Sequence, residues 1–184
     1  MELVFKRRRL ERIRLVILMD VSGSMEPNSQ FFYQFAHACL SQRGLGRVEV
    51  FAFSTQLYRL TRALQIKGIR KAEQALICAL GRRSTGTRIG FCFEKFLHQY
   101  KHNLRRDTVV LVLSDGWDTG NLELLDQTLV RMKRYGILLF WFNPLAGSQG
   151  YEPTTSGMRV ILPHTDVCAP VIDLESLRRF KDSL

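Results

Sequence analysis

The segment from residue 13 to residue 24 reads IRLVILMDVSGS. Its first seven residues are almost continuously apolar and branched, which is typical of a strand buried on both faces of a parallel sheet. Asp20, Ser22 and Gly23 then break the strand with turn residues. A polar turn directly after a buried strand marks the carboxyl end of that strand, where α/β proteins bind their ligands.

The remaining chain alternates between strand-like and helix-like segments. Buried-strand patterns recur over residues 48–53, 108–113 and 137–142, and a short hairpin strand is expected over 57–61. Helical patterns cover residues 29–42, 69–80, 89–102, 122–134 and 174–181, while residues 145–172 are expected to be mostly loop. This order predicts an α/β fold, a Rossmann-like, doubly wound, mostly parallel sheet with helices on both faces.

Length and composition indicate one globular domain. The chain has 184 residues, of which 46% are hydrophobic and 24% are charged, as in ordinary soluble proteins. We expect a basic arm over residues 1–12 and the domain over residues 13–184. No apolar run approaches the roughly 18 residues that span a bilayer. Four widely spaced cysteines favour buried free thiols in a reducing compartment, so the cytoplasm is the expected location.

The net charge of +10 is unusual for a domain of this size. Much of the excess lies near the start of the chain, at Lys6, Arg7, Arg8, Arg9, Arg12 and Arg14. Such a cluster attracts nucleic acid, acidic lipid or an acidic protein, or it is simply a solvated arm. The sequence leaves these interpretations open.

Three oxygen-bearing side chains alternate along the turn after the first strand. Asp20 supplies a carboxylate, Ser22 and Ser24 supply hydroxyls, and a glycine between them lets the backbone bend so that the oxygens converge. Asp115 follows another buried strand, so its carboxylate is expected at the same edge of the sheet. Hard divalent cations prefer oxygen ligands of this kind. The sequence therefore predicts a site for Mg²⁺ or Mn²⁺.

The balance of charge at this site favours binding of a further anion. Thr87, in the loop before the helix over 89–102, adds another neutral hydroxyl. Two carboxylates only neutralise a divalent ion, so an incoming Glu or Asp of another protein is a natural additional ligand. The predicted metal ligands are Asp20, Ser22, Ser24, Thr87 and Asp115.

This combination resembles the metal-ion-dependent adhesion site (MIDAS) of von Willebrand factor A (VWA) domains. The resemblance runs from about residue 13 to residue 177. It is closest to the CoxE-like subfamily over residues 20–26, 47–54, 86–90, 113–118, 143–145 and 150–153. Ser84 and Thr85 stand where that subfamily tends to have glycines, so Thr85 remains an alternative to Thr87 as a ligand.

The resemblance also implies a role. CoxE-like proteins are accessory proteins that act beside a MoxR-type AAA+ ATPase. Together they assist the assembly or metal-centre maturation of a molybdenum hydroxylase such as carbon monoxide dehydrogenase. For this chain, the resemblance implies a metal-dependent interaction module whose partner presents an acidic residue.

Some of the polar residues have an ordinary structural interpretation. Asp20 alone resembles a helix cap, and only its combination with Thr87 and Asp115 favours the metal site. Trp117 and Asp118 either cap the helix that follows them or form the rim of the metal site, and both interpretations stay open.

Other patterns favour packing over chemistry. His98 and His102 are spaced to lie on one helix face, but Gln99 replaces the glutamate of the zincin pattern, so a solvated or half-buried face is favoured. The phenylalanines at positions 31, 32 and 35 are expected to pack in the core.

Two other classes of function compete with the interaction module. A magnesium-dependent phosphohydrolase also places Asp after its first strand, but Ser22 replaces the second acid, and no histidine lies in the expected site loops. An electrostatic nucleic-acid binder would use two basic clusters, but only charge supports it. These are Arg7, Arg8 and Arg9 in the arm, and Arg82, Arg83 and Arg88 beside Thr87. The Walker A pattern is absent from the sequence. We therefore expect neither enzymatic activity nor a nucleic-acid partner.

Overall fold

A central strand, β1 (Arg14–Asp20), lies within a six-stranded sheet in the computed structural model. The strand order is β3-β2-β1-β4-β5-β6, and each pairing is parallel except that of β2 with β3. The structure describes residues 14–42, 45–80, 86–106, 108–147 and 155–170. The order of the strands, with helical crossovers between parallel neighbours, confirms the predicted doubly wound α/β fold.

The bounds of the other elements follow the predicted alternation closely. The remaining strands are β2 (Val48–Phe53), β3 (Leu57–Arg59), β4 (Thr108–Leu113), β5 (Leu138–Phe142) and β6 (Val167–Ala169). The helices in the described part of the chain are α1 (Glu26–Ser41), α2 (Thr61–Leu80), α3 (Ile89–Tyr100), α4 (Leu122–Lys133) and α5 (Ser156–Ile161).

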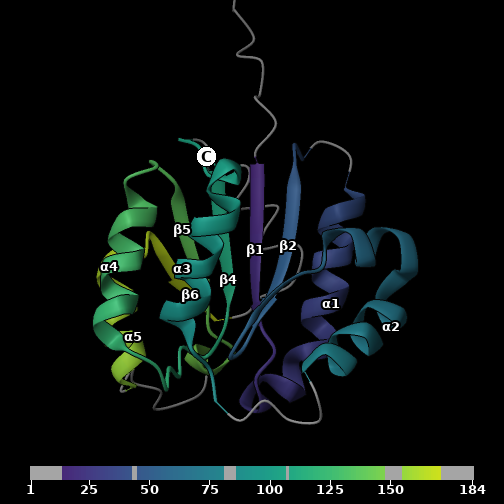
Figure 1. Ribbon diagram of the computed structural model, residues 1–184, viewed down its shortest axis with the longest axis horizontal. Coiled ribbons are helices and arrows are strands. Elements are labelled where there is room, and N and C mark those ends of the chain that lie inside the picture. Colours follow the sequence, from purple (N-terminus) through teal and green to yellow (C-terminus); the bar gives the residue numbers. More distant parts are fainter. Residues whose placement is uncertain (1–13, 43–44, 81–85, 107, 148–154, 171–184) are drawn as a thin grey trace, which may run out of the picture.

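Helices cover both faces of the sheet, with α1 and α2 on one face and α3, α4 and α5 on the other (Figure 1). The side chains of β1 alternate between these two layers. Val16 and Leu18 belong to the core under α3, α4 and α5, whereas Ile17 and Met19 belong to the core under α1 and α2. Because β1 is buried on both faces, its sequence has to be apolar at nearly every position.

Close packing fixes α3 against its neighbours. Phe93 and Phe96 of α3 meet Phe53 and Phe51 of β2 edge to face, with ring centroids 5.5 and 5.1 Å apart. At Gly90 a Cβ atom would lie 2.8 Å from the backbone nitrogen of a residue in α4, so this position has no room for a side chain. The amino end of α3, which follows Thr87, is therefore held firmly in place.

Several element boundaries differ from the prediction. α1 begins at Glu26 rather than at residue 29, because a proline in its first turn suits a helix start. α2 begins at Thr61 and is broken at Gly68, whose φ is 73°. The helix predicted over 69–80 is therefore only the second part of α2. α5 and β6 lie in a region predicted to be loop, since elements of six and three residues are too short to show a period.

Three local predictions are wrong in part. Phe31 is 36% exposed, whereas the phenylalanines at 32 and 35 are buried. His102 lies in a 3₁₀ turn after α3 rather than in the helix with His98. Cys78 and Cys168 are exposed, so only the other two thiols are buried as expected.

The basic arm over 1–12 and the helix expected over 174–181 lie outside the described residues. Within the described residues, no helix combines the length and the apolar character that crossing a membrane requires.

Candidate metal centre

The candidate site is centred on Asp20, the last residue of β1. This side chain is fully buried between the ends of β2 and β4. Its Oδ1 accepts a hydrogen bond from the backbone N–H of Ser22 at 2.9 Å, and its Oδ2 accepts one from the hydroxyl of Ser114 at 2.7 Å. Both carboxylate oxygens are thus held by neutral donors at the carboxyl edge of the sheet, the edge at which β1, β2, β4 and β5 end.

Burial dominates the electrostatics of this carboxylate. It raises the pKa of Asp20 to about 6, even though the hydrogen bonds from Ser22 and Ser114 lower it, and the nearby charge of Asp115 adds a smaller upward shift. An ionised carboxylate that is buried among neutral groups is stabilised strongly by a cation. A bound metal ion would therefore stabilise the ionised form of Asp20.

Two hydroxyls converge in the turn after β1. The Oγ atoms of Ser22 and Ser24 lie 3.2 Å apart, with Ser22 buried and Ser24 exposed. A short 3₁₀ turn, Gly23–Met25, brings them together, and the backbone N–H of Met25 donates to the carbonyl of Ser22 at 3.0 Å. Met25 is itself buried in the core under α1, so it anchors the turn.

Asp115 stands at the end of β4, beside Ser114. It is buried, and its Oδ1 accepts a hydrogen bond from the backbone N–H of Trp117 at 2.9 Å. The side-chain amide of Asn143, which follows β5, donates to the carbonyl of Asp115 at 3.1 Å. The neighbouring Gly116 has a φ of 73°, which permits the sharp turn after the carboxylate.

Thr87 is held from the loop that follows β4. Its carbonyl accepts hydrogen bonds from both the backbone N–H and the hydroxyl of Thr119, at 2.8 and 2.9 Å. Its side chain is buried, and no described residue forms a hydrogen bond with its hydroxyl. The hydroxyl of Thr87 therefore remains free to act as a metal ligand. The alternative ligand, Thr85, lies outside the described residues.

Asp118 has a role that neither interpretation of the sequence foresaw. Its Oδ1 accepts hydrogen bonds from the backbone N–H of Ile89, the first residue of α3, and from that of Gly120. It therefore ties the start of α3 to the loop after β4. The following helix, α4, is capped instead by Asn121, whose side chain accepts from Leu124.

The donor set fits a hard divalent cation. Two carboxylates and three hydroxyls stand at the carboxyl edge, and one of the carboxylates is fully buried without a cationic partner among the described residues. No cluster of three or more His, Cys, Asp or Glu side chains suited to a metal occurs in the described part of the chain. Any metal at this edge would thus rely on hydroxyl ligands as well as carboxylates.

The sequence did not reveal which residues support these ligands. Ser114 bonds directly to Asp20, Thr119 holds the carbonyl of Thr87, and Asn143 holds the carbonyl of Asp115. Ser114 and Asn143 each directly follow a predicted strand, which places them at the carboxyl edge. Their hydrogen-bond partners, however, could not be read from the sequence.

Exposed apolar side chains lie in segments at the same edge of the sheet as the candidate ligands. Trp117, in the loop after β4, is 61% exposed. Leu145, after β5, is 45% exposed, and Phe91, in the first turn of α3, is 43% exposed. Arg88, next to Thr87, is also exposed. Arg82 and Arg83, the two other arginines of the basic cluster around Thr87, lie outside the described residues.

Solved structures with this fold include several VWA domains. BatB from Bacteroides thetaiotaomicron matches with a TM-score of 0.60 at 14% identity, over 92% of this chain and 96% of that chain. A von Willebrand factor type A protein from Catenulispora acidiphila matches with a TM-score of 0.60 at 16% identity, over 94% and 42%. Proximal thread matrix protein 1 from the mussel byssus, with a zinc-occupied MIDAS motif, matches with a TM-score of 0.56 at 14% identity, over 94% and 46%.

At these identities the structural matches establish the fold alone. No curated protein sequence matches this chain significantly. The family described as "VWA domain containing CoxE-like protein" matches residues 1–177, which is nearly the whole chain. The chain therefore belongs to the CoxE-like family of VWA-domain proteins.

Proposed function

We propose that this chain is a metal-ion-dependent protein-interaction module. The observation that carries the proposal is the fully buried carboxylate of Asp20, with the hydroxyls of Ser22 and Ser24 in the adjoining turn. The proposed ligands are Asp20, Ser22, Ser24, Thr87 and Asp115, and the proposed ion is Mg²⁺ or Mn²⁺.

The charge balance of this ligand set supports a role in binding. Asp20 and Asp115 carry the negative charges, and the three hydroxyl ligands are neutral, so a divalent ion would be only just neutralised. A bound ion would supply an electrostatic attraction for one more carboxylate. We propose that this carboxylate belongs to a Glu or Asp of a partner protein.

The rim of the site supports a protein partner. Trp117 presents most of its side chain to solvent two residues from Asp115. Aromatic residues are enriched among those that dominate the binding energy of protein interfaces. Phe91 and Leu145 are also exposed apolar side chains in segments at this edge of the sheet. A partner could thus bury this rim while its acidic residue reaches the metal.

Membership of the CoxE-like family supports a more specific role. We propose that the partner is a MoxR-type AAA+ ATPase. The pair would assist the assembly or metal-centre maturation of a molybdenum hydroxylase such as carbon monoxide dehydrogenase. The zinc-occupied MIDAS motif of the mussel protein supports the idea that a protein of this fold can hold a divalent ion. We propose no catalytic residue in this chain, since Ser22 stands where an aspartyl phosphohydrolase needs its second acid.

A pull-down with the candidate ATPase in Mn²⁺ and in EDTA tests the proposal. We expect the complex to form with Mn²⁺, to be lost in EDTA, and to be lost in Ser22→Ala/Ser24→Ala. Ser29→Ala, in α1 outside the candidate site, is the matched control and should bind normally. Binding that persists both in EDTA and in the double variant would show that the metal does not hold the partner.

A further inference from the structure

The opposite edge of the sheet, at the amino ends of the parallel strands, carries a row of arginines. Arg14 begins β1, Arg47 directly precedes β2, and Arg105 and Arg106 precede β4 by two or three residues. Arg59 ends β3, which runs antiparallel, so it reaches the same edge. Neighbouring strands in a sheet are about 4.8 Å apart. Four adjacent strands therefore each bring at least one guanidinium to this edge.

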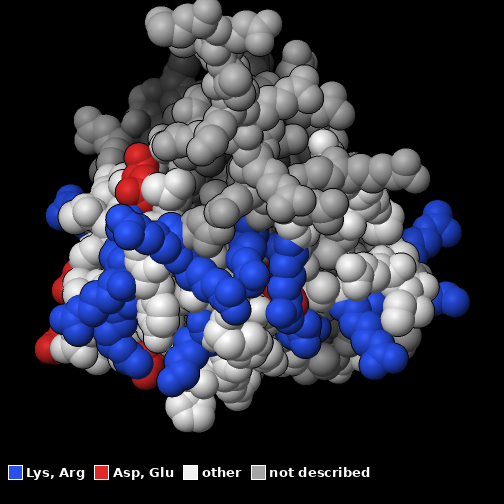
Figure 2. All heavy atoms as spheres, turned by 90° about the horizontal axis from the view of Figure 1, so that it is seen from above, with Lys and Arg blue, Asp and Glu red and all other residues white. Residues whose placement is uncertain are grey.

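The row continues to β5. Arg134 lies in the turn between α4 and β5 and is exposed. In the same turn, a Cβ atom on Gly136 would lie 3.2 Å from the Cγ of Arg106, so the stem of Arg106 packs against this turn. Figure 2 shows Lys and Arg side chains gathered across this end of the molecule. We call Arg14, Arg47, Arg59, Arg105, Arg106 and Arg134 the arginine edge.

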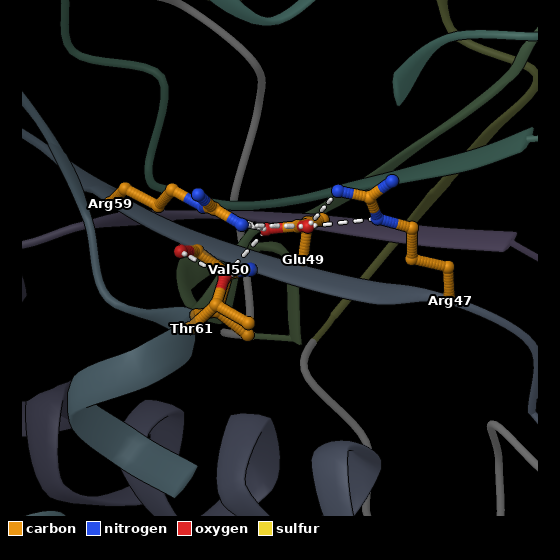
Figure 3. Close-up of polar contacts among 5 residues, drawn as sticks. All are labelled: Arg47, Glu49, Val50, Arg59 and Thr61. Carbon is orange, nitrogen blue, oxygen red and sulfur yellow. Dashed lines mark hydrogen bonds and ion pairs between the residues drawn. The ribbon is translucent and has the colours of Figure 1, made fainter. Parts of the chain in front are cut away.

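One carboxylate is already bound at the arginine edge. Glu49 is 4% exposed, and it accepts hydrogen bonds from Nε of Arg47 and Nε of Arg59, each at 2.9 Å, and from the hydroxyl of Thr61 at 2.8 Å (Figure 3). Although burial raises the pKa of Glu49, the hydrogen bonds from Thr61 and the two arginines outweigh it and leave this pKa lowered. The edge thus stabilises an ionised carboxylate.

Room remains for further carboxylates. The side chains of Arg47 and Arg59 are still 52% and 45% exposed while they hold Glu49. A pocket of about 310 Å³ adjoins them and is lined mostly by polar side chains, including those of Gln42 and Gln65. The outer faces of both guanidiniums are therefore accessible to a second ligand.

Ordinary structural roles explain only some of the arginines in the arginine edge. Arg134 follows the carboxyl end of α4, where a positive charge offsets the helix dipole. Arg14 begins β1, and Arg105 and Arg106 precede β4; none of the three forms an ion pair with a described residue. The nearby Asp166 is paired with Lys133 and so does not neutralise them. Their charge is uncompensated within the described part of the chain.

We propose that the arginine edge is a second docking surface, which binds an acidic segment of a partner protein without a metal ion. Guanidinium groups can bind carboxylates through two parallel hydrogen bonds, as Arg59 does with Glu49. An extended chain places alternate side chains about 6.6 Å apart. Several Asp or Glu residues of one strand-like segment can thus reach arginines on neighbouring strands.

An acidic protein fits this surface better than a single-stranded nucleic acid does. Single-strand binders combine positive charge with aromatic side chains on which bases stack. Four aromatic side chains are exposed among the large hydrophobic residues of the described part of the chain. Of these, Trp117 and Phe91 stand at the carboxyl edge, on the far side of the sheet, and Phe31 lies on α1. Tyr135 is the one that adjoins the arginine edge, and it is 38% exposed.

Fluorescence anisotropy of the full chain with a labelled peptide of alternating Glu and Ser tests the proposal. We expect binding that weakens with salt and persists in EDTA. Arg105→Glu/Arg106→Glu/Arg134→Glu should weaken it by about tenfold or more. The matched control reverses three exposed charges outside the arginine edge, two on α2 and one on α5, in Arg70→Glu/Lys71→Glu/Arg159→Glu, and should change the affinity by less than about twofold.

A single-stranded oligonucleotide of equal charge forms the second arm, and thermal melting verifies that each variant folds. If the reversed variant does not fold, Arg105→Gln/Arg106→Gln replaces it with the same expected direction. Equal weakening by the edge and control variants would overturn the proposal, because it would reflect net charge alone. Tighter binding of the oligonucleotide than of the peptide, or loss of peptide binding in EDTA, would overturn it as well.

Discussion

The hydroxyl of Ser114 donates a 2.7 Å hydrogen bond to Oδ2 of Asp20, although 94 residues separate them in the chain. The same hydroxyl accepts a hydrogen bond from the backbone N–H of Gly116 at 3.0 Å. β1 and β4 are adjacent parallel strands, so their ends lie side by side. Ser114 thereby couples the two strand ends that carry the two candidate carboxylate ligands.

Replacing Ser114 by alanine should weaken both the fold and the metal site. The change leaves Oδ2 of Asp20 and the N–H of Gly116 without their partner, which costs about 1–3 kcal/mol of unfolding free energy. Ser114→Thr keeps the hydroxyl and should restore part of the loss. Denaturant unfolding without metal measures the stability, and calorimetric titration with Mn²⁺ measures the affinity. Wild-type affinity in Ser114→Ala would show that Ser114 does not position Asp20.

Metal ions should stabilise the folded chain. A ligand that binds only the folded state adds about 2.7 kcal/mol when present at a hundred times its dissociation constant. We expect Mg²⁺ or Mn²⁺ to raise the melting temperature of the wild type, and Asp20→Ala and Asp20→Asn to abolish the response. Ser29→Ala serves as the control and should respond normally. Equal shifts in the wild type and in both Asp20 variants would remove the site from this edge.

Glu49 should make stability depend on pH in the acid range. Its pKa is lowered in the folded protein, so its contribution is present above the ordinary value of 4.5 and is lost as the pH falls below it. Glu49→Gln should lower the unfolding free energy by about 1–3 kcal/mol at pH 7. The gap to the wild type should then narrow as the pH falls through 4.5.

Urea unfolding between pH 3 and pH 7 measures this gap. The control is Glu123→Gln, since the side chain of Glu123 contacts Gln127 on the surface of α4 rather than an arginine. A gap for Glu49→Gln that stays constant with pH would mean that ionisation of Glu49 contributes nothing to stability.

Trp117 should contribute to partner binding without contributing to metal binding. Its side chain is exposed, and only its backbone N–H contacts Asp115. Trp117→Ala should weaken the partner complex by about 2 kcal/mol, as for other central aromatic contacts, and mainly through faster dissociation. Tyr135→Ala, at the opposite edge, is the control. Surface plasmon resonance in Mn²⁺ gives both rates, and an unchanged dissociation rate would place the partner elsewhere.

The candidate site should not hydrolyse phosphate esters. Ser22 stands two residues after Asp20, where an aspartyl phosphohydrolase needs its second acid, and no histidine among the described residues forms a hydrogen bond with Asp20. We expect no turnover of p-nitrophenyl phosphate in Mg²⁺. Turnover that disappears in Asp20→Asn would contradict this expectation and favour the phosphohydrolase.

The sequence alone predicted the fold, which the structure confirms, and it named the candidate ligands, which stay a prediction. The nearly continuous apolar run of β1 is typical of a strand buried on both faces, as in a sheet covered by helices on both sides. The carboxyl ends of such strands share one edge, so Asp20 and Asp115 could be placed together from their positions after two buried strands. These inferences rest on local patterns that recur at fixed spacings.

Short elements and hydrogen-bond partners were beyond the reach of such patterns. β6 has only three residues and forms because it pairs with β5. A hydrophobic period in the local sequence cannot predict such a pairing. Asp118 was expected to cap α4 or to form the rim of the site, yet it accepts from the start of α3, 29 residues earlier. Loop conformation decides such contacts, and the loop is fixed by packing around it.

The arginine edge likewise combines features that are visible in the sequence with an arrangement that only the fold creates. Each arginine is visible in the sequence as one positive charge near a predicted strand or turn. The folded sheet aligns them. β3 runs antiparallel to β2, so Arg59 at the end of β3 lies toward the edge where β1 and β2 begin. Local sequence determined which segments became strands and which oxygens followed them. The tertiary structure alone decided which distant side chains meet, because sheet order and register bring together residues that the chain separates by tens of positions.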